Sequence, residues 1–214
     1  MTITGDLIIR FVERAAERIH AGRDELTELD AMIGDADHGS NLDRGFTAVV
    51  ERLDELEGHA PGIVLEMVGR TLLATVGGAA GPLYGTAFIR AGEFLGTRDA
   101  VTLADIADAL ERALQGVVER GRVTLGEKTM VDALAPGVAA VRDAADGDAT
   151  LLDALHRMVD AVEAGMWATV EMEATKGRAR YLGARSVGHR DPGAASVYMI
   201  TLALRDTLEE GDHE

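Results

Sequence analysis

Hydrophobic side chains recur along most of this chain at steps of three and four residues, which is the spacing of one face of an α-helix. The pattern is clearest from Leu7 to Ile19, and residues 26–32 continue it beyond Gly22. No convincing two-residue alternation of the kind that marks a β-strand appears. Further helices are expected over residues 42–53, 63–72, 83–91, 103–118, 130–138, 151–166 and 197–204.

Residues typical of helix boundaries agree with these segments. Thr102 and Thr150 stand where N-caps are expected, and Asp191-Pro192 is typical of an N-cap followed by a first-turn proline. The inventory is about eight helices joined by short loops, which favours antiparallel neighbours in a bundle or barrel. Because no linker divides the chain, we expect one all-α domain, with a core from about residue 5 to 208 and a frayed tail over 209–214.

Composition limits what such a fold can do. Aromatic residues make up 4% of the chain, so aliphatic side chains and Met must fill the core, and a hollow barrel could hold a lipid. The 214 residues carry 37 acidic and 21 basic side chains, which gives a net charge of −16. That charge argues against binding to nucleic acid or to an anionic membrane surface. An anionic ligand would therefore have to bring or borrow metal ions.

The chain holds no cysteine, which excludes disulfides, thiolate nucleophiles and zinc-thiolate sites and is compatible with the cytosol. Its first residues lack a basic region followed by an apolar run, so no signal peptide is expected. No apolar stretch approaches the roughly 20 residues of a membrane span. We therefore expect a cytoplasmic protein.

Candidate chemistry is densest in the stretch from Asp30 to Asn41, which holds two further aspartates, Asp35 and Asp37, and a histidine. Carboxylates this close repel one another unless a cation lies among them, and Mg²⁺ prefers oxygen ligands of this kind. On a continuous helix the three aspartates could not converge, but Gly34 can end the helix and let the chain turn. A lone Asp-x-Asp is more often a solvated turn, whereas the whole cluster favours a magnesium site.

Two glycine-containing loops are candidates for contact with a phosphate. The run Gly77–Gly81 lies between two expected helices, where small residues let backbone N–H groups and a helix N-terminus approach a ligand. Taken alone, such a run is more often a tight turn. The junction at residues 126–130 is similar, although the commoner outcome there is that Thr129 caps the next helix and Lys128 faces solvent.

The stretch from Ala174 to Gly193 breaks the helical pattern and holds five cationic side chains besides His189. Local positive charge in a chain of opposite overall sign favours a polyanionic partner. The alternative is a mobile basic loop that pairs with acidic neighbours.

These four stretches together resemble the nucleotide-binding subunit or domain of dihydroxyacetone kinases, the DhaL family, over nearly the whole chain to about Leu208. The specific strings are Gly-Asp-Ala-Asp-His-Gly at 34–39, Ala-Thr-Lys-Gly-Arg-Ala at 174–179 and Gly-His-Arg-Asp-Pro-Gly at 188–193. The resemblance implies an eight-helix antiparallel up-and-down barrel with the nucleotide at one rim.

The resemblance also implies roles for single residues. Asp30, Asp35 and Asp37 would be the ligands of two Mg²⁺ ions that bridge the phosphates of ADP or ATP. No residue would act as a covalent nucleophile, because the nucleotide itself carries the phosphoryl group. The residues implied to contact the nucleotide are His38, Gly39, Ser40 and Asn41 at the phosphates, Gly78, Ala79, Ala80 and Gly81 in a backbone cradle, Gly121 and Met130 near the adenine and ribose, and Arg178, Asp191, Pro192 and Gly193 closing the site.

The implied function is that of a phosphotransferase subunit. A phosphohistidine partner of the DhaM type would phosphorylate bound ADP, and the resulting ATP would phosphorylate dihydroxyacetone held by a DhaK-type subunit. Some members also touch a transcriptional regulator, and a homodimer is a further possibility. The alternatives are a nucleotide-exchanging subunit of an ATP-dependent kinase and a non-catalytic module whose nucleotide state controls docking. A di-iron bundle is disfavoured, because two aligned Glu-x-x-His pairs are not found.

One departure from the family bears on nucleotide affinity. Where members commonly have Thr-Ser, this chain has Ala79-Ala80. Each missing hydroxyl removes a hydrogen bond to a charged phosphate, worth roughly 1.5–3 kcal/mol. We therefore expect looser, exchangeable nucleotide, held by the backbone N–H groups that remain.

Overall fold

The computed structural model describes residues 3–147 and 149–211. Within them the only extended pairing is a single bridge between Ile3 and Val101, so the all-α prediction is confirmed. Of the expected frayed tail, residues 209–211 belong to the last helix and 212–214 lie outside the described residues. The elements are α1 Gly5–Ala21, α2 Arg23–Ile33, α3 His38–Val50, α4 Pro61–Thr75, α5 Ala80–Leu95, α6 Leu103–Gly121, α7 Met130–Ala145, α8 Leu151–Ala168 and α9 Pro192–Gly211, with short 3-10 helices η1 Leu53–Leu56, η2 Thr169–Glu171 and η3 Ala179–Ser186.

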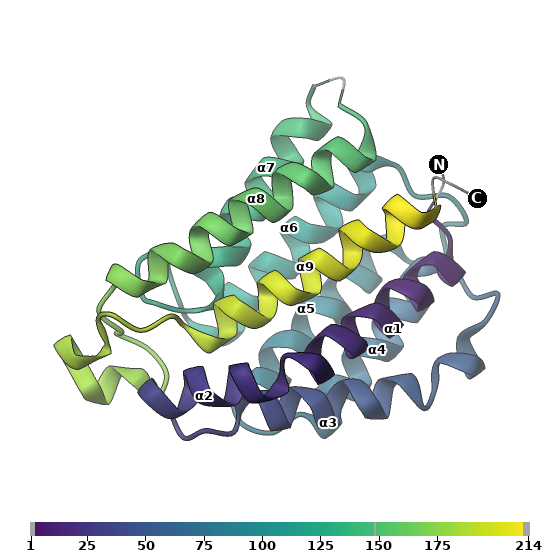
Figure 1. Ribbon diagram of the computed structural model, residues 1–214. Coiled ribbons are helices and arrows are strands. Elements are labelled where there is room, and N and C mark those ends of the chain that lie inside the picture. The colour runs from purple at the N-terminus through teal and green to yellow at the C-terminus, as the bar shows by residue number, and fades with distance from the viewer. Residues whose placement is uncertain (1–2, 148, 212–214) are drawn as a thin grey trace.

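The helices form an antiparallel up-and-down barrel (Figure 1). From α3 onward each α-helix packs against the next one along the chain, and α9 returns to lie beside α1, which closes the ring. α2 continues α1 beyond Gly22, so the two helices together occupy one position in the ring. The eight-helix barrel expected from the sequence is therefore confirmed, with α2 as an extension of the first helix.

The helix starts predicted from the sequence are confirmed as well. α9 begins at Pro192, and the Asp191 carboxylate accepts a hydrogen bond at 2.7 Å from the N–H of Ala194. Each N-cap of this kind contributes about 1 kcal/mol. Complete capping boxes begin three other helices, at Thr102, Thr129 and Thr150.

The core between the helices is mostly aliphatic, and its side chains include Val12, Ile19 and Leu42, each fully buried. Burying a side chain of this size contributes roughly 1.5–3 kcal/mol. An apolar cavity of about 160 Å³ remains inside the barrel, with Phe11 and Phe88 in its wall. None of the helices in the described part is long and apolar enough to cross a membrane.

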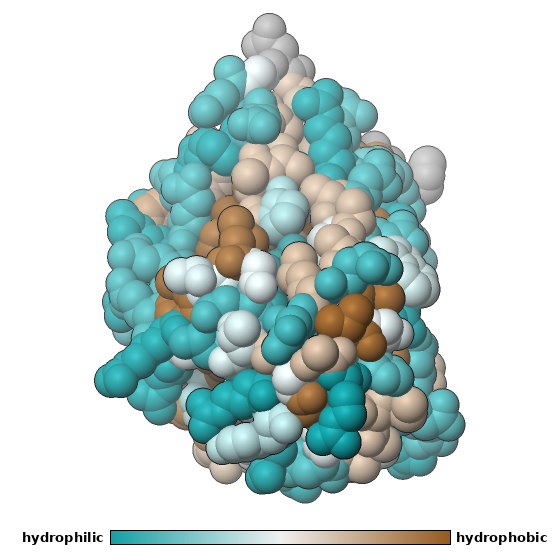
Figure 2. All heavy atoms as spheres, turned by 90° about the vertical axis from the view of Figure 1, so that its left-hand side faces the viewer, coloured by the Kyte–Doolittle hydropathy of each residue, from teal (hydrophilic) through white to brown (hydrophobic). Residues whose placement is uncertain are grey.

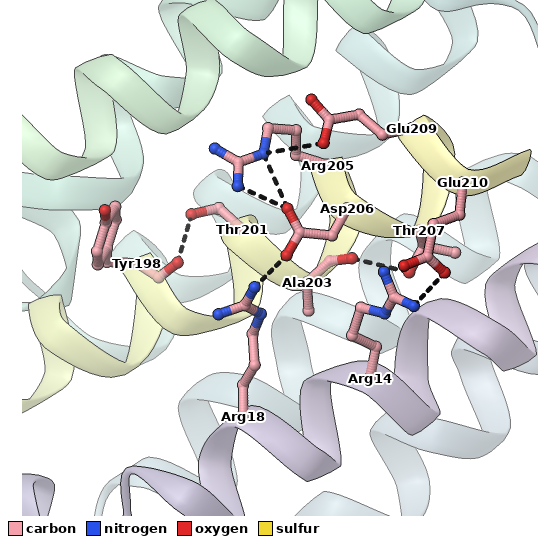
Figure 3. Close-up of polar contacts among 10 residues, drawn as sticks. All are labelled: Arg14, Arg18, Tyr198, Thr201, Ala203, Arg205, Asp206, Thr207, Glu209 and Glu210. Atoms are coloured by element: carbon pink, nitrogen blue, oxygen red, sulfur yellow. Dashed lines mark hydrogen bonds and ion pairs between the residues drawn. The ribbon is translucent and has the colours of Figure 1, made fainter. Parts of the chain in front are cut away.

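Ion pairs connect α1 with α9, where the ring of helices closes (Figure 3). Arg18 of α1 reaches Asp206 of α9, and Arg205 donates to the same carboxylate at 2.6 Å. Farther along, Arg14 pairs with Glu210. Although burial alone would raise the pKa of Asp206, hydrogen bonds from Arg205 and Arg18 hold it below its usual value.

Candidate functional site

The four candidate stretches meet at one end of the barrel, on the left in Figure 1. A pocket of about 700 Å³ lies there, among the ends of α2 and α6 and the starts of α3, α5, α7 and α9, with part of η3 in its wall. Figure 2 looks onto this end, where hydrophilic and apolar side chains are interspersed. Segments far apart in the sequence thus contribute to one site.

Three aspartates converge in this pocket. Asp30 near the end of α2, Asp35 in the following loop and Asp37 just before α3 each place a carboxylate oxygen within 4.8 Å of the others. Asp30 is only 8% exposed, whereas Asp35 is exposed, so the cluster extends from the protein interior to the pocket surface. Three carboxylates at this separation are suited to a hard divalent cation such as Mg²⁺.

The loop that carries the cluster is folded around Asp30. Its Oδ2 atom accepts hydrogen bonds from the backbone N–H groups of Asp37 at 2.9 Å and His38 at 3.1 Å. Gly34 ends α2 as predicted, but its φ of −139° is not left-handed. Glycine is required there for space, because a Cβ would lie 1.9 Å from Asp30 Oδ1. The left-handed turn occurs instead at Ala36, with a φ of 61°.

Strained backbone gathers around the pocket. In the described part of the chain, the non-glycine residues with positive φ are Ala36, Arg122 and Lys128. Such conformations cost on the order of 1–3 kcal/mol each and persist only where the surrounding structure fixes them, often at functional sites. Arg122 and Lys128 line the pocket, and Ala36 separates two of the clustered aspartates.

Two helices begin at the pocket without a cap from their own N-cap residue. Neither Asp37 before α3 nor Ala79 before α5 makes a capping hydrogen bond, in contrast with the capping boxes of α6, α7 and α8. At α3 the N–H of His38 is already bonded to Asp30 Oδ2, whereas no side chain caps the first N–H groups of α5. The dipoles of both helices favour an anion at this end. The arrangement suits phosphate oxygens beside the acidic cluster.

The glycine loop before α5 packs closely on α3. A Cβ at Gly77 would lie 2.8 Å from Asn41 Oδ1, and Gly78 has a left-handed φ of 65°. Arg44 holds this contact in place, since its guanidinium donates to Asn41 Oδ1 at 2.8 Å and to the Thr75 carbonyl at 3.2 Å. The small residues thus bring the loop backbone against the wall of the pocket.

Lys128 is buried, and the expectation that it faces solvent is wrong. Its side chain is 1% exposed, and Nζ donates to the carbonyl oxygens of Thr169 and His189. Burial lowers the pKa of Lys128, while the negative charge of Asp191 opposes that shift. The buried ammonium group donates to these two carbonyl oxygens in place of water. It therefore links η2 to the segment before α9.

Asp191 has an unusual environment for a carboxylate. Part of its surface is open to the pocket, but the surrounding protein desolvates the group and raises its pKa to about 7. The hydrogen bond from the N–H of Ala194 and the charge of Lys128 limit the rise, whereas Asp132 and Asp30 add to it. Asp191 thus titrates near neutral pH at the edge of the candidate site.

A row of buried hydroxyl groups lies beside His38. The Nε2 atom of His38 is 2.9 Å from Ser196 Oγ, which is 2.7 Å from the Tyr84 hydroxyl. Ser196 is fully buried and Tyr84 is 4% exposed. Burial lowers the pKa of His38 and raises that of Tyr84, so both side chains are neutral at pH 7.

Several basic side chains also line the pocket. Arg178 is exposed, and its Nε donates to Asp35 Oδ2 at 2.8 Å. In a chain of net charge −16, the basic residues of this pocket concentrate positive charge where an anionic ligand would lie. The other cationic residues that line the pocket are Arg120, Arg122, Lys128, Lys176 and Arg180.

Most of the residues implied by the resemblance line the pocket, but three do not. Gly39 and Gly81 are buried contacts between segments, where a Cβ would lie 2.0 Å from the Arg23 carbonyl oxygen and 2.3 Å from that of Val76. Ser40 is exposed outside the pocket lining. Those brought together with the aspartates are His38, Asn41, Gly78, Ala79, Ala80, Gly121, Met130, Arg178, Asp191, Pro192 and Gly193.

Sequence reasoning missed several residues of the pocket. Tyr84, Leu83 and Val117 occupy helical positions that were assigned to the core, and Arg120 and Arg122 end a helix that looked ordinary. No local signal separates them from core or surface residues. The basic stretch did contain a signal for Lys176 and Arg180, since their charge is opposite to that of the whole chain.

Comparisons with known proteins agree with this geometry. The DAK2 domain family matches residues 32–206. The chain is 39% identical over 210 residues to the ADP-binding subunit DhaL of the PEP-dependent dihydroxyacetone kinase of Escherichia coli strain K12, which covers 96% of this chain and 100% of that subunit. It is 40% identical over 194 residues to the ADP-binding subunit DhaL of PEP-dependent dihydroxyacetone kinase 2 of Listeria innocua, covering 90% of this chain and 89% of that subunit.

A solved structure shares the fold. The dihydroxyacetone kinase of C. freundii, in complex with AMP-PNP and Mg²⁺, superposes with a TM-score of 0.74 at 23% sequence identity. The match covers 97% of this chain but 35% of that kinase, so the chain spans about a third of its length.

Proposed function

The chain belongs to the DAK2 domain family and, within it, to the ADP-binding DhaL subunits of dihydroxyacetone kinases, and from that premise we propose that it is a nucleotide-binding phosphotransferase subunit. One observation carries the proposal. Three carboxylates within 4.8 Å of one another lie beside the N-termini of α3 and α5 in a single pocket. The carboxylates suit Mg²⁺ and the N-termini suit phosphate, so the pocket fits a magnesium–diphosphate complex.

The proposed roles follow from position. Asp30, Asp35 and Asp37 would hold two Mg²⁺ ions, which would neutralise phosphate charge when bound. The starts of α3 and α5 would supply N–H donors to the phosphates of ADP or ATP. The basic residues of the pocket, with Arg178, would add cationic donors. Gly121 and Met130 would lie beside the adenine and ribose.

The finer function rests on the relatives. Their names describe ADP-binding subunits of PEP-dependent kinases, and we propose that this subunit likewise works with a DhaK-type subunit that holds dihydroxyacetone and a DhaM-type phosphohistidine donor. We place it in the cytoplasm. A transcriptional regulator and a second copy of this chain are further proposed partners.

A second candidate is favoured by one feature of the sequence. Ala79 and Ala80 line the pocket and cannot donate side-chain hydrogen bonds to phosphate. Loosely held nucleotide would exchange with the solvent pool, so the subunit could draw on free ATP. A non-catalytic module that docks according to its nucleotide state is the third candidate.

Calorimetry with ADP, with and without Mg²⁺, tests the binding proposal. We expect magnesium-dependent binding in the wild-type protein and its loss in Asp35→Asn and Asp37→Asn variants of unchanged helicity. Binding that survives these substitutions would refute the assignment of these aspartates as magnesium ligands.

Reconstitution with DhaK- and DhaM-type partners then distinguishes the three candidate functions. Turnover driven by phosphoenolpyruvate supports the first, turnover driven by ATP alone supports the second, and nucleotide-dependent association without turnover supports the third.

A further inference from the structure

Ser196 and Tyr84 make a buried polar contact with a residue of the nucleotide site. Ser196 comes from α9, Tyr84 from α5 and His38 from α3, so three walls of the barrel meet at these groups. His38 is half-buried and lines the pocket, and its Nε2 atom is turned toward Ser196 Oγ at 2.9 Å. In the described part of the chain no hydrogen bond reaches its other ring nitrogen, Nδ1. Any contact that the ring makes with a ligand is therefore left to Nδ1.

The hydroxyl groups of Tyr84 and Ser196 have one hydrogen atom each, so only a few hydrogen-bonding arrangements with His38 are possible. The 2.7 Å separation between the Tyr84 hydroxyl and Ser196 Oγ requires one hydrogen between them. If Tyr84 donates that hydrogen, Ser196 has a single proton left, which goes either to His38 Nε2 at 2.9 Å or to the Gly193 carbonyl at 3.0 Å. In the reverse arrangement Ser196 donates to Tyr84, which lies 3.3 Å from the same carbonyl.

These arrangements give His38 different ring tautomers. When Ser196 donates to Nε2, a neutral imidazole carries its own proton on Nδ1. When Ser196 donates elsewhere, Nε2 must carry the proton and donate to Ser196, and Nδ1 becomes a bare acceptor. A phosphate oxygen accepts hydrogen bonds only, so a bare Nδ1 beside it would be repelled. A bound nucleotide therefore selects the arrangement in which Tyr84 donates to Ser196 and Ser196 donates to His38.

We propose that Ser196 and Tyr84 are positioning residues that hold His38 as its Nδ1–H tautomer, so that this N–H donates to a phosphate of the nucleotide. The inference rests on the proposed nucleotide-binding function. Because the hydroxyl groups are buried, water does not compete for Nε2. The contact with Ser196 also fixes the orientation of the ring, so only the proton arrangement has to change when the nucleotide binds.

The test combines a spectroscopic signature with two affinities. Long-range ¹H–¹⁵N spectra of the imidazole rings, with His38 assigned by a His38→Asn variant, report which ring nitrogen is protonated in the complex with Mg²⁺ and ADP. We expect the Nδ1–H tautomer in the wild-type protein and its loss in Ser196→Ala. ADP affinity should fall about tenfold in that variant, as for loss of one hydrogen bond to a charged group, with adenosine affinity unchanged.

Two further variants keep the outcome interpretable. Tyr84→Phe retains the ring in the core and removes only the first donor, so it should weaken ADP binding in the same direction. Thr207→Val removes another buried hydroxyl of α9, one that donates only to the Ala203 carbonyl of its own helix, and should leave the tautomer and both affinities unchanged. If Ser196→Ala fails to fold, the wild-type spectrum still reports the tautomer of His38. The ADP affinity of Tyr84→Phe then still reports whether the buried hydroxyl groups matter.

The outcomes that overturn the inference are distinct from those that overturn the function. An Nε2–H tautomer in the ADP complex, or equal losses of ADP and adenosine affinity in the hydroxyl variants, would refute the positioning role while leaving nucleotide binding intact. A wild-type protein that binds no ADP in the presence of Mg²⁺ would remove the proposed function and this inference together.

Discussion

Arg178 and Asp35 form an ion pair in the pocket, with Arg178 Nε 2.8 Å from Asp35 Oδ2. The resemblance to the DhaL family implies different roles for these two side chains, with Asp35 binding magnesium and Arg178 closing the nucleotide site. Their side chains are 70% and 35% exposed, and a pair this accessible is worth less than about 1 kcal/mol. The guanidinium can therefore leave the carboxylate at little cost when a metal ion takes its place and a phosphate arrives.

Replacing Arg178 should affect the two ligands in opposite directions. In Arg178→Met, Asp35 loses its competing cation, so Mg²⁺ without nucleotide should bind up to a few-fold more tightly. Binding of ADP with Mg²⁺ should weaken about tenfold or more, because a charge-assisted hydrogen bond to phosphate is lost. Calorimetric titrations with Mg²⁺ alone and with ADP at saturating Mg²⁺ measure both effects.

The neighbouring exposed arginine provides a matched control. Arg180 lines the pocket, and its guanidinium donates to the hydroxyl group of Tyr181 at 2.8 Å and not to the aspartates. Arg180→Met removes the same charge from the same pocket and should leave the affinity for Mg²⁺ alone unchanged. If both variants change the two affinities alike, the effect is one of general charge and not of the Arg178–Asp35 pair.

Introducing hydroxyl groups at the start of α5 should tighten nucleotide binding. In Ala79→Thr with Ala80→Ser, each new hydroxyl group can donate to a phosphate oxygen, a bond worth roughly 1.5–3 kcal/mol. Even one such bond corresponds to about a tenfold slower release of ADP. Stopped-flow chase of a fluorescent ADP analogue measures that rate. An unchanged release rate would show that the alanines are not the reason for exchangeable nucleotide.

Stability without ligand should depend on Asp191 around neutral pH. Its folded-state pKa of about 7 lies above the unfolded value of about 3.9, so the native state binds the extra proton between them. This contribution is fully present below about pH 4 and is lost as the pH rises toward 7. Asp191→Asn keeps an N-cap side chain but cannot ionise, so it should gain stability relative to wild type between about pH 5 and pH 8.

Urea unfolding at those two pH values, without Mg²⁺, checks the prediction. Asp54→Asn, an exposed change on η1, serves as the control and should shift stability equally at both. A difference between Asp191→Asn and wild type that does not change with pH would mean that the carboxylate does not titrate in this range.

Asp206 should show the opposite pH dependence. Its pKa is lowered in the folded state by Arg205 and Arg18 in spite of burial, so its stabilising contribution is present above about pH 4 and is lost as the pH falls further. Asp206→Asn should cost about 1–3 kcal/mol at neutral pH and much less at about pH 3. Thermal or urea unfolding at both pH values measures the change. Glu210→Gln, at a 70% exposed side chain, should change the free energy of unfolding much less than Asp206→Asn does.

Local features of the fold were predictable, because helix periodicity and capping depend on residues within a few positions of one another. Thr102, Thr129 and Thr150 show this, since each cap is made within three residues. The convergence of the aspartates was also within reach, because Gly34 marks the break that allows it. The sequence did not indicate that a glycine is also needed there for space, because a Cβ would lie 1.9 Å from Asp30 Oδ1.

The contacts that shape the site's interior were beyond a reading of the sequence. His38 and Ser196 are 158 residues apart, and Tyr84 and Ser196 are 112 apart. Lys128 looks like a surface lysine until the fold places two carbonyl groups at its tip, 41 and 61 residues away. Such pairings depend on how the barrel closes, and no spacing along the chain indicates them.

Because the ring of helices is closed, the pocket depends on how the helices pack and not on which of them comes first along the chain. α1 begins and α9 ends at the barrel end opposite the pocket (Figure 1), and the turn at Gly58, before α4, lies there too. A circular permutant that joins the end of α9 to the start of α1 and opens the chain at Gly58 would leave every wall of the pocket in place. Its ends would then emerge on the far side from the site, where a fused domain could be attached without obstructing access.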